Sequence, residues 1–152
     1  MTDIFLHTLL MAMTPVVELR GAIPYGLAMG LDPMATFIAA VMGNIIPAPF
    51  IILFVRKVFH WMRRTSKWLG ETVDKLERRA AEKSDMVLKY ALWGLVILVA
   101  IPLPGTGAWT GALVAALMDI RLSRALPAII LGVVLAGIIV MAVSTGVIAI
   151  IT

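Results

Sequence analysis

The chain has 152 residues, of which 61% are hydrophobic and 14% are charged, with a formal net charge of +4 at pH 7. About a quarter of the residues in a soluble domain are charged, and the mean hydropathy here is +1.01. This composition excludes an ordinary soluble protein and indicates a single integral membrane domain over residues 1–152. The absence of cysteine excludes disulfides, thiol catalysis and thiolate metal sites.

Four apolar segments are too short to cross a hydrocarbon core of about 30 Å alone. They form two pairs, residues 4–13 with 22–31 and residues 86–101 with 107–118. The first begins without Lys or Arg, so we do not expect a cleavable secretory signal. The pairs flank TPVVELRG and PLPG, whose Pro and Gly mark turns. We therefore predict two re-entrant helical hairpins, whose tips must be buried in protein or line a cavity.

Two longer apolar segments, residues 34–55 and 125–151, carry no charge and are long enough to cross a bilayer. Between them, residues 56–89 hold most of the 13 basic residues. We expect an amphipathic interfacial helix there with Trp61 and Trp68 as anchors, or a solvated charged loop over 77–85. Basic residues favour the cytoplasmic side. We therefore expect a multi-pass protein of the inner (plasma) membrane, with this segment in the cytoplasm and both termini outside.

An internal similarity relates RGAIPYGLAMGLD (20–32) to TGAWTGALVAALMD (106–119). The two stretches share a Gly-Ala pair, a Leu and, after one gap, a final Asp, and each is followed by a long apolar segment. The predicted fold is an all-α integral membrane protein with two inverted repeats, each a re-entrant helical hairpin followed by a transmembrane helix. Repeat one covers 1–55, the cytoplasmic amphipathic linker 56–85, and repeat two 86–152.

Glu18 and Arg20 fall in the first hairpin tip, where a charged side chain costs about 2.5–3.5 kcal/mol. Half-helices that start at Gly21 and Gly107 would point their N–H groups at the membrane centre. Together with Arg20 and two threonine hydroxyls they predict an anion site, with Glu18 as the protonatable or ion-coupling group. The alternative is a permanent Glu18–Arg20 ion pair that only holds the tip in shape. The candidate substrate- and ion-binding residues are Glu18, Arg20, Gly21, Pro24, Pro102, Pro104, Gly105, Thr106, Gly107 and Thr110.

The stretch ELRGAIPYG, followed by AIPLPGTGAWTGALVAAL, closely resembles the small multidrug export protein family, and the match runs from Thr14 to the final helix. The two-hairpin plan also resembles DedA-type membrane proteins, some of which are linked to moving undecaprenyl phosphate across the bacterial membrane and to proton-dependent phenotypes. That resemblance implies roles for an acidic residue near the first hairpin, which Glu18 matches, and for arginines near the second. This chain differs there, because its second tip has no arginine and its intramembrane arginine is Arg20.

The leading hypothesis is a transporter or exporter, coupled to an ion with H⁺ as the first choice, that binds a small molecule with an anionic or polar head between the tips. A related hypothesis is a flippase for undecaprenyl phosphate or a phospholipid, and another is a non-transporting scaffold that docks through residues 56–89. We expect membrane lipid but no nucleic acid as a partner, no cofactor and no metal, and no enzyme activity, since no nucleophile–base pair is visible. A homodimer face is predicted at four small residues, Gly132, Ala136, Gly137 and Gly146.

Overall fold

The computed structural model describes residues 2–65, 67–68, 70–72, 74–75, 85–103 and 106–151, and these residues are helical apart from short connections. The all-α prediction is confirmed for them. Each predicted apolar segment corresponds to a helix whose ends lie within a few residues of the prediction, except where the first long segment continues further. The helices in chain order are α1 (Thr2–Ala12), α2 (Glu18–Ala28), α3 (Pro33–Ile45), α4 (Pro47–Thr65), α6 (Asp85–Ala100), α7 (Ala108–Leu117) and α8 (Leu122–Ile151).

Two helical segments, Pro33–Thr65 and Leu122–Val147, are long and apolar enough to cross a membrane. The first joins α3 to α4 through Ile46, which keeps helical angles of φ −52° and ψ −45°. Pro47 therefore interrupts the hydrogen bonding without turning the chain. At 1.5 Å per residue the 33 residues extend about 50 Å, more than the hydrocarbon core requires. The excess consists of the end of α4, which continues past residue 55 into the basic segment.

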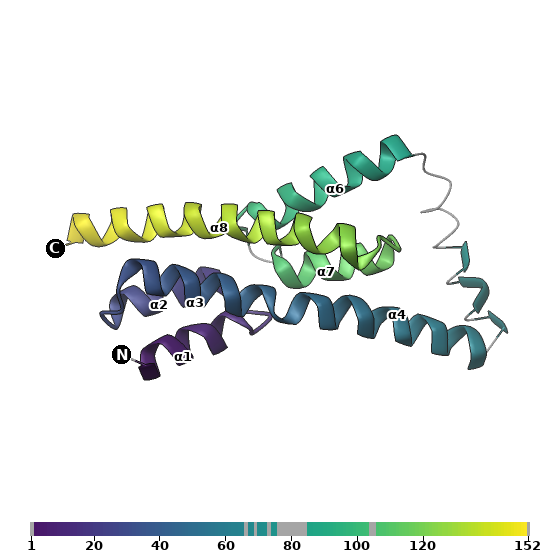
Figure 1. The fold of residues 1–152 in the computed structure, drawn as a ribbon, viewed down its shortest axis with the longest axis horizontal. Coiled ribbons are helices and arrows are strands. Elements are labelled where there is room, and N and C mark those ends of the chain that lie inside the picture. The colour runs from purple at the N-terminus through teal and green to yellow at the C-terminus, as the bar shows by residue number, and fades with distance from the viewer. Residues whose placement is uncertain are drawn as a thin grey trace.

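The helices form an elongated bundle in which α8 lies alongside α3, with α1 and α2 packed on α3 and with α6 and α7 packed on α8 (Figure 1). Both termini lie at one end of the long axis, and α4 leads to the other. Small residues allow the closest approaches. A β-carbon at Gly43 of α3 would collide with the carbonyl oxygen of Leu9 in α1, and one at Gly132 of α8 would lie 2.6 Å from the Val99 side chain in α6.

The small residues of α8 are used mainly inside the chain. Gly132 meets α6, Ala136 is 1% exposed, and a β-carbon at Gly137 would lie 2.8 Å from the Phe37 ring of α3. The prediction that these residues form a homodimer face is therefore wrong for three of the four. Only for Gly146, among the four, would an added β-carbon meet no atom within 4 Å.

Helices α2 and α7 end in the same way. Each is closed by the two backbone hydrogen bonds of a Schellman motif, with a residue of positive φ that is Gly30 in α2 (φ +79°) and Asp119 in α7 (φ +50°). The residues that follow, Leu31 and Ile120, are buried. The structural counterpart of Asp119 is thus Gly30. The sequence comparison paired Asp119 with Asp32, which instead accepts hydrogen bonds from backbone N–H groups at the start of α3.

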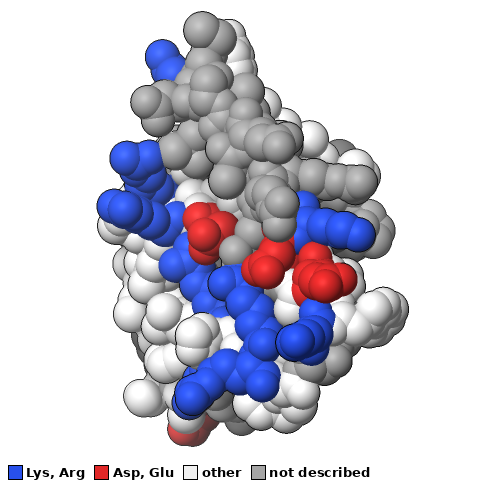
Figure 2. All heavy atoms as spheres, turned by 90° about the vertical axis from the view of Figure 1, so that its right-hand side faces the viewer, with Lys and Arg blue, Asp and Glu red and all other residues white. Residues whose placement is uncertain are grey.

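Positive charge gathers at the end of the molecule that α4 reaches. Figure 2 looks onto this end and shows Lys and Arg over much of it, with Asp and Glu among them. Apart from Arg20, the described Lys and Arg residues fall within residues 56–75, at Lys89 in α6 and at Arg121 and Arg124 around the start of α8. The predicted interfacial helix lies partly outside the described residues, because only parts of 66–84 are described. Trp61 and Trp68, its predicted anchors, are 64% and 73% exposed.

Candidate functional site

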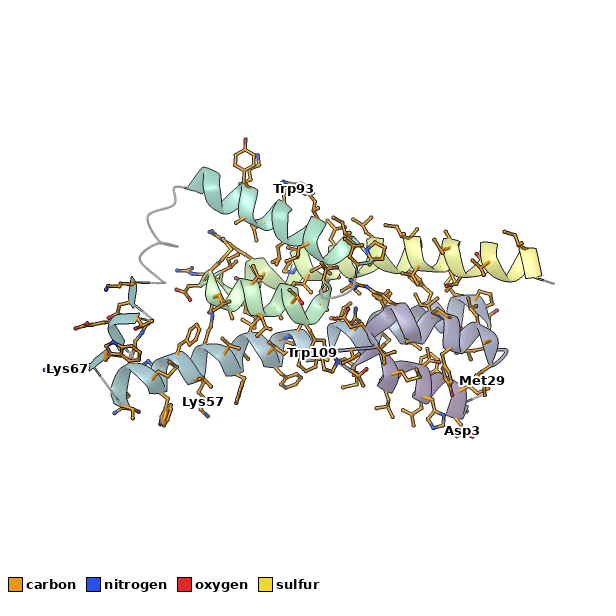
Figure 3. The ribbon with its side chains drawn as sticks, turned by 180° about the vertical axis from the view of Figure 1, so that it is seen from behind. Asp3, Met29, Lys57, Lys67, Trp93 and Trp109 are labelled. Carbon is orange, nitrogen blue, oxygen red and sulfur yellow. The ribbon has the colours of Figure 1, made fainter. Side chains whose placement is uncertain are left out.

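The turn between α1 and α2 meets the turn between α6 and α7 near the middle of the long axis. Figure 3 shows Trp109, in the first turn of α7, in this middle region, with Lys67 toward one end and Asp3 and Met29 toward the other. The Trp109 indole N–H donates a hydrogen bond to the carbonyl oxygen of Met13, at 3.1 Å. The second hairpin is therefore tied to the backbone of the first.

Arg20 makes the reciprocal connection from the first hairpin to the second. Its guanidinium donates hydrogen bonds to the carbonyl oxygens of Leu103 and Ile101, the latter at 3.2 Å, and to the hydroxyl oxygen of Thr106 at 2.9 Å. The Thr106 hydroxyl also lies 2.7 and 2.8 Å from the same two carbonyls and can donate to either. The structure thus brings Arg20 and Thr106 together across the two turns.

Glu18 reaches the start of α7. The residue is 5% exposed, and its carboxylate lies 4.0 Å from the Arg20 guanidinium. The carboxylate accepts a hydrogen bond from the backbone N–H of Trp109, the second residue of α7. A β-carbon at Gly107 would collide with this carboxylate. Gly107 is the N-cap of α7 and has no side chain to cap it, so Glu18 supplies from another helix the negative group that a helix N-terminus favours.

The helix starts correct the predicted anion site in two respects. Helix α7 begins at Ala108 with Gly107 as its cap, as predicted, but its N-terminus faces the Glu18 carboxylate of the same chain. Helix α2 begins at Glu18 and not at Gly21, which lies in its first turn. A β-carbon at Gly21 would collide with the Val17 side chain, so this glycine permits a tight first turn. Of the two predicted helix starts, the one at α7 is confirmed and has a carboxylate beside it, and the one at α2 lies three residues earlier than predicted.

The remaining candidate residues are distributed around this cluster. Thr110 lies in the first turn of α7, and Pro102 is exposed between the two residues whose carbonyls bind Arg20. Pro24 is exposed in the interior of α2, away from the contacts described between the turns. Because proline has no N–H, Pro24 removes the donor that an α-helix normally gives to the Arg20 carbonyl. Pro104 and Gly105 lie outside the described residues.

Two kinds of hydrogen-bonding group in this cluster were not predicted from the sequence: backbone carbonyl oxygens and the indole N–H of Trp109. The carbonyl oxygens of Met13, Ile101 and Leu103 bind side chains, and backbone acceptors leave no residue-type signal. Trp109 offered a partial signal, because an indole next to the cap glycine of a buried helix needs an acceptor for its N–H. Within the described part of the chain, Arg20 also has a buried Nε without a hydrogen-bond partner. The Nε of Arg20 is therefore a donor that the contacts described here leave unused.

The chemical capacity of this cluster follows from its charges. One carboxylate is held by a guanidinium and by a helix N-terminus, both of which favour a negative group. Protonation of Glu18, or a second anion that takes its place, would weaken the contact between the hairpins while leaving the donors in position. An external anion would therefore compete with the deprotonated Glu18 carboxylate for these donors.

No curated protein and no solved structure matched the chain. A family model does match. Residues 18–139, which run from the start of α2 through α3, α4, α6 and α7 into α8, match the model of the family described as "Putative small multi-drug export protein". Because this match covers well over half of the sequence, and two helices are long and apolar enough to cross a bilayer, the chain belongs to this family of membrane proteins.

Proposed function

We propose that this protein is a proton-coupled transporter whose substrate carries an anionic or polar head, and that the head and Glu18 compete for the same donors. The family description supports transport. The observation that carries the proposal is the position of the Glu18 carboxylate, beside Arg20 and at the N-terminus of α7. An anionic head placed there would meet the same guanidinium and the same backbone N–H groups.

Coupling to protons follows from this competition. A deprotonated Glu18 occupies the donors. An anion can therefore bind there only if the Glu18 carboxylate moves away or is protonated. Uptake of a proton by Glu18 would release the N-terminus of α7 and Arg20 together, so that proton binding and anion binding favour each other. The contact between the hairpins would then alternate between a closed state held by Glu18 and an open state that holds substrate.

The membrane arrangement is part of the same proposal. The α1–α2 and α6–α7 pairs are re-entrant hairpins that enter from opposite faces, within inverted repeats over 1–55 and 86–152 joined by a cytoplasmic linker. Three features support it: the pairs start from opposite ends and turn near the middle (Figure 1), α2 and α7 end in matching motifs, and cations gather at the linker end (Figure 2). Inverted repeats with a site at their interface are common in secondary transporters.

The test measures binding at the turns with Trp109 as the reporter. Trp61, Trp68 and Trp93 are replaced by Phe, and fluorescence is recorded in detergent with dodecyl phosphate as the anionic probe and dodecyltrimethylammonium as the cationic one. We expect dodecyl phosphate to change the Trp109 emission. Arg20→Gln should weaken this binding at least tenfold, because it removes the cation, whereas Glu18→Gln should strengthen it, because the competing charge is gone.

Matched controls separate the turns from general charge effects. Asp3→Asn and Arg64→Gln make the same charge changes away from the turns and should leave binding within about twofold. Transport is then measured with labelled dodecyl phosphate in proteoliposomes under a pH gradient, and a labelled phospholipid in parallel tests the flippase version. Equal binding by all four variants, or a response to the cationic probe alone, would contradict the proposal.

A further inference from the structure

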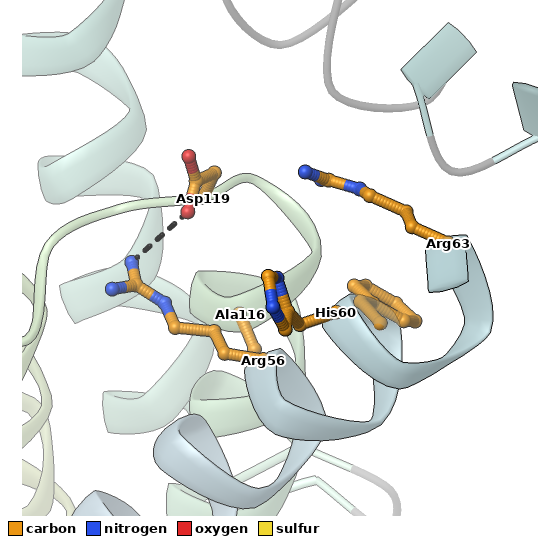
Figure 4. A pocket seen from close by; sticks show the side chains of 6 residues that line it. Arg56, His60, Arg63, Ala116 and Asp119 are labelled. Atoms are coloured by element: carbon orange, nitrogen blue, oxygen red, sulfur yellow. Dashed lines mark ion pairs between the residues drawn. The ribbon is translucent and has the colours of Figure 1, made fainter. Parts of the chain in front are cut away.

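A pocket of about 220 Å³ lies at the basic end, far along α4 from the meeting turns. Figure 4 shows it between the later part of α4 and the end of α7, with the side chains of both elements around it. Its lining residues are Arg56, Phe59, His60, Arg63, Ala116 and Asp119. None of them belongs to the cluster proposed for transport.

The cationic lining is a consequence of helix periodicity. Arg56, His60 and Arg63 are four and three residues apart, so one face of α4 presents all three to the pocket. Opposite them is a single carboxylate, Asp119, whose oxygen lies 3.3 Å from the Arg56 guanidinium. Arg56 also donates to the carbonyl oxygen of Ile120, which fixes its head at the pocket wall. The other guanidinium, Arg63, pairs with Asp74 at 3.4 Å, and Asp74 does not line the pocket. A bound anion would therefore share both guanidiniums with carboxylates, within the positive field of the further Lys and Arg residues of 56–75.

The surroundings indicate where that negative group comes from. Before the pocket, α4 is strongly apolar and presents exposed Phe50, Leu53 and Phe54, which are 68%, 53% and 67% exposed. Trp61, exposed and suited to an interface, lies within the stretch of α4 that lines the pocket, and further basic residues follow it. The pocket therefore lies where an apolar helix surface meets a cationic end, which is the level of phospholipid head groups at a membrane surface.

We propose that this pocket binds the phosphate head group of an anionic membrane lipid. Basic pockets between helices on the cytoplasmic side recognise such head groups, and the planar fork of arginine matches phosphate oxygens. The volume is below the roughly 300–1,000 Å³ of pockets that enclose drug-sized ligands. A phosphate and its glycerol would occupy the pocket, while the acyl chains would lie outside it, toward the apolar part of the molecule.

Asp119 gives the site a built-in competitor. Its carboxylate already holds Arg56, so a bound phosphate must share that guanidinium. Asp119 has a positive φ of +50°, a conformation that asparagine also adopts readily. Asp119→Asn therefore removes the opposing charge with little change in backbone preference, and it should strengthen lipid binding several-fold. A site that does not bind anions would gain nothing from this substitution.

The experiment uses the purified full chain in detergent and counts bound phosphatidylglycerol by native mass spectrometry, with phosphatidylcholine as the neutral lipid. The double variant His60→Gln/Arg63→Gln should lower phosphatidylglycerol binding about tenfold or more, and Asp119→Asn should raise it. Arg64→Gln, the neighbouring cation that does not line the pocket, should change it less than about twofold. Thermal unfolding in phosphatidylcholine establishes that each variant is folded.

Three results would overturn the proposal. They are equal binding of the two lipids, unchanged phosphatidylglycerol binding in the double variant, and weaker binding in Asp119→Asn. Glycerol phosphate added alone distinguishes the source of the phosphate: if it occupies the site as tightly as the lipid with the same residue dependence, a soluble ligand and not a lipid is recognised. The Trp109 response to dodecyl phosphate should be the same in the double variant and the unmodified chain, so failure here is separable from failure of the transport proposal.

Discussion

Replacement of Gly107 by alanine tests the contact that joins the two hairpins. Gly107 has φ +142° and ψ −166°, a region that is almost confined to glycine and costs another residue on the order of 1–3 kcal/mol. The added β-carbon would also collide with the Glu18 carboxylate. Overpacking of this kind costs about 1–3 kcal/mol more. We therefore expect Gly107→Ala to lower the free energy of unfolding by about 2–6 kcal/mol.

Two other glycines separate the contributions. Gly30 has φ +79°, but a β-carbon there would meet nothing within 4 Å, so Gly30→Ala measures backbone strain alone, about 1–2 kcal/mol. Gly94 lies in α6, has no positive φ and has the same open surroundings, so Gly94→Ala should be neutral or stabilising by about 0.5–1 kcal/mol. Unfolding is followed by fluorescence in mixed micelles with increasing sodium dodecyl sulfate.

A double-mutant cycle with Glu18→Ala isolates the collision. In that background Gly107→Ala should lose its packing cost and keep only the strain of about 1–3 kcal/mol. The reasoning would be refuted by a Gly107→Ala variant that is as stable as Gly94→Ala, or by an effect of Gly107→Ala that is independent of residue 18. Either result would mean that the carboxylate does not lie against the α7 cap.

Two further predictions concern packing and topology. Gly132→Ala should lower the free energy of unfolding by about 1–3 kcal/mol, because its β-carbon would meet Val99 and the Val96 carbonyl. In the same helix, the β-carbon of Gly146→Ala would meet nothing, so this variant should change the free energy of unfolding by less than about 0.5 kcal/mol. Equal effects of the two variants in the same micelle assay would argue against the α6–α8 contact. The chain has no cysteine, so Asp3→Cys and Lys67→Cys each provide a single labelling position in cells. A membrane-impermeant maleimide should label Asp3→Cys from outside, but it should label Lys67→Cys only after lysis. Labelling of both variants from the same side would contradict the proposed orientation.

The helices themselves could be predicted from the sequence, because apolar length and Pro-Gly turns determine where a chain can enter and leave a bilayer. The end of α4 was less predictable. The sequence predicts an amphipathic helix from residue 56, but it does not predict that this helix continues the first long apolar segment without a break to Thr65. The start of α2 was missed for a related reason: Val17, its N-cap, has helical angles and makes no side-chain capping bond, so no capping residue marks it.

The site was predictable in its charges but not in their partners. Glu18 and Arg20 stand out because ionisable residues in an apolar chain need compensation. Which groups compensate them depends on the meeting of segments more than 80 residues apart, and the acceptors for Arg20 include backbone carbonyls that any residue supplies. Asp119 shows the converse. Its identity suggested equivalence with Asp32, but backbone geometry makes Gly30 its counterpart, because an αL cap position is defined by φ and not by the side chain.

The contacts between the hairpins are reciprocal in geometry but unequal in chemistry. The first hairpin supplies the carboxylate and the guanidinium, and the second supplies a helix N-terminus, two carbonyls, a hydroxyl and an indole. The turn of the second hairpin contains no arginine. Arg20 nevertheless places its guanidinium against the backbone of that hairpin, since the two turns meet. The second turn therefore carries a positive charge although its own sequence has no arginine. Because Arg20 and Glu18 both belong to the first hairpin, a change in how the hairpins meet would move both side chains together relative to the second turn.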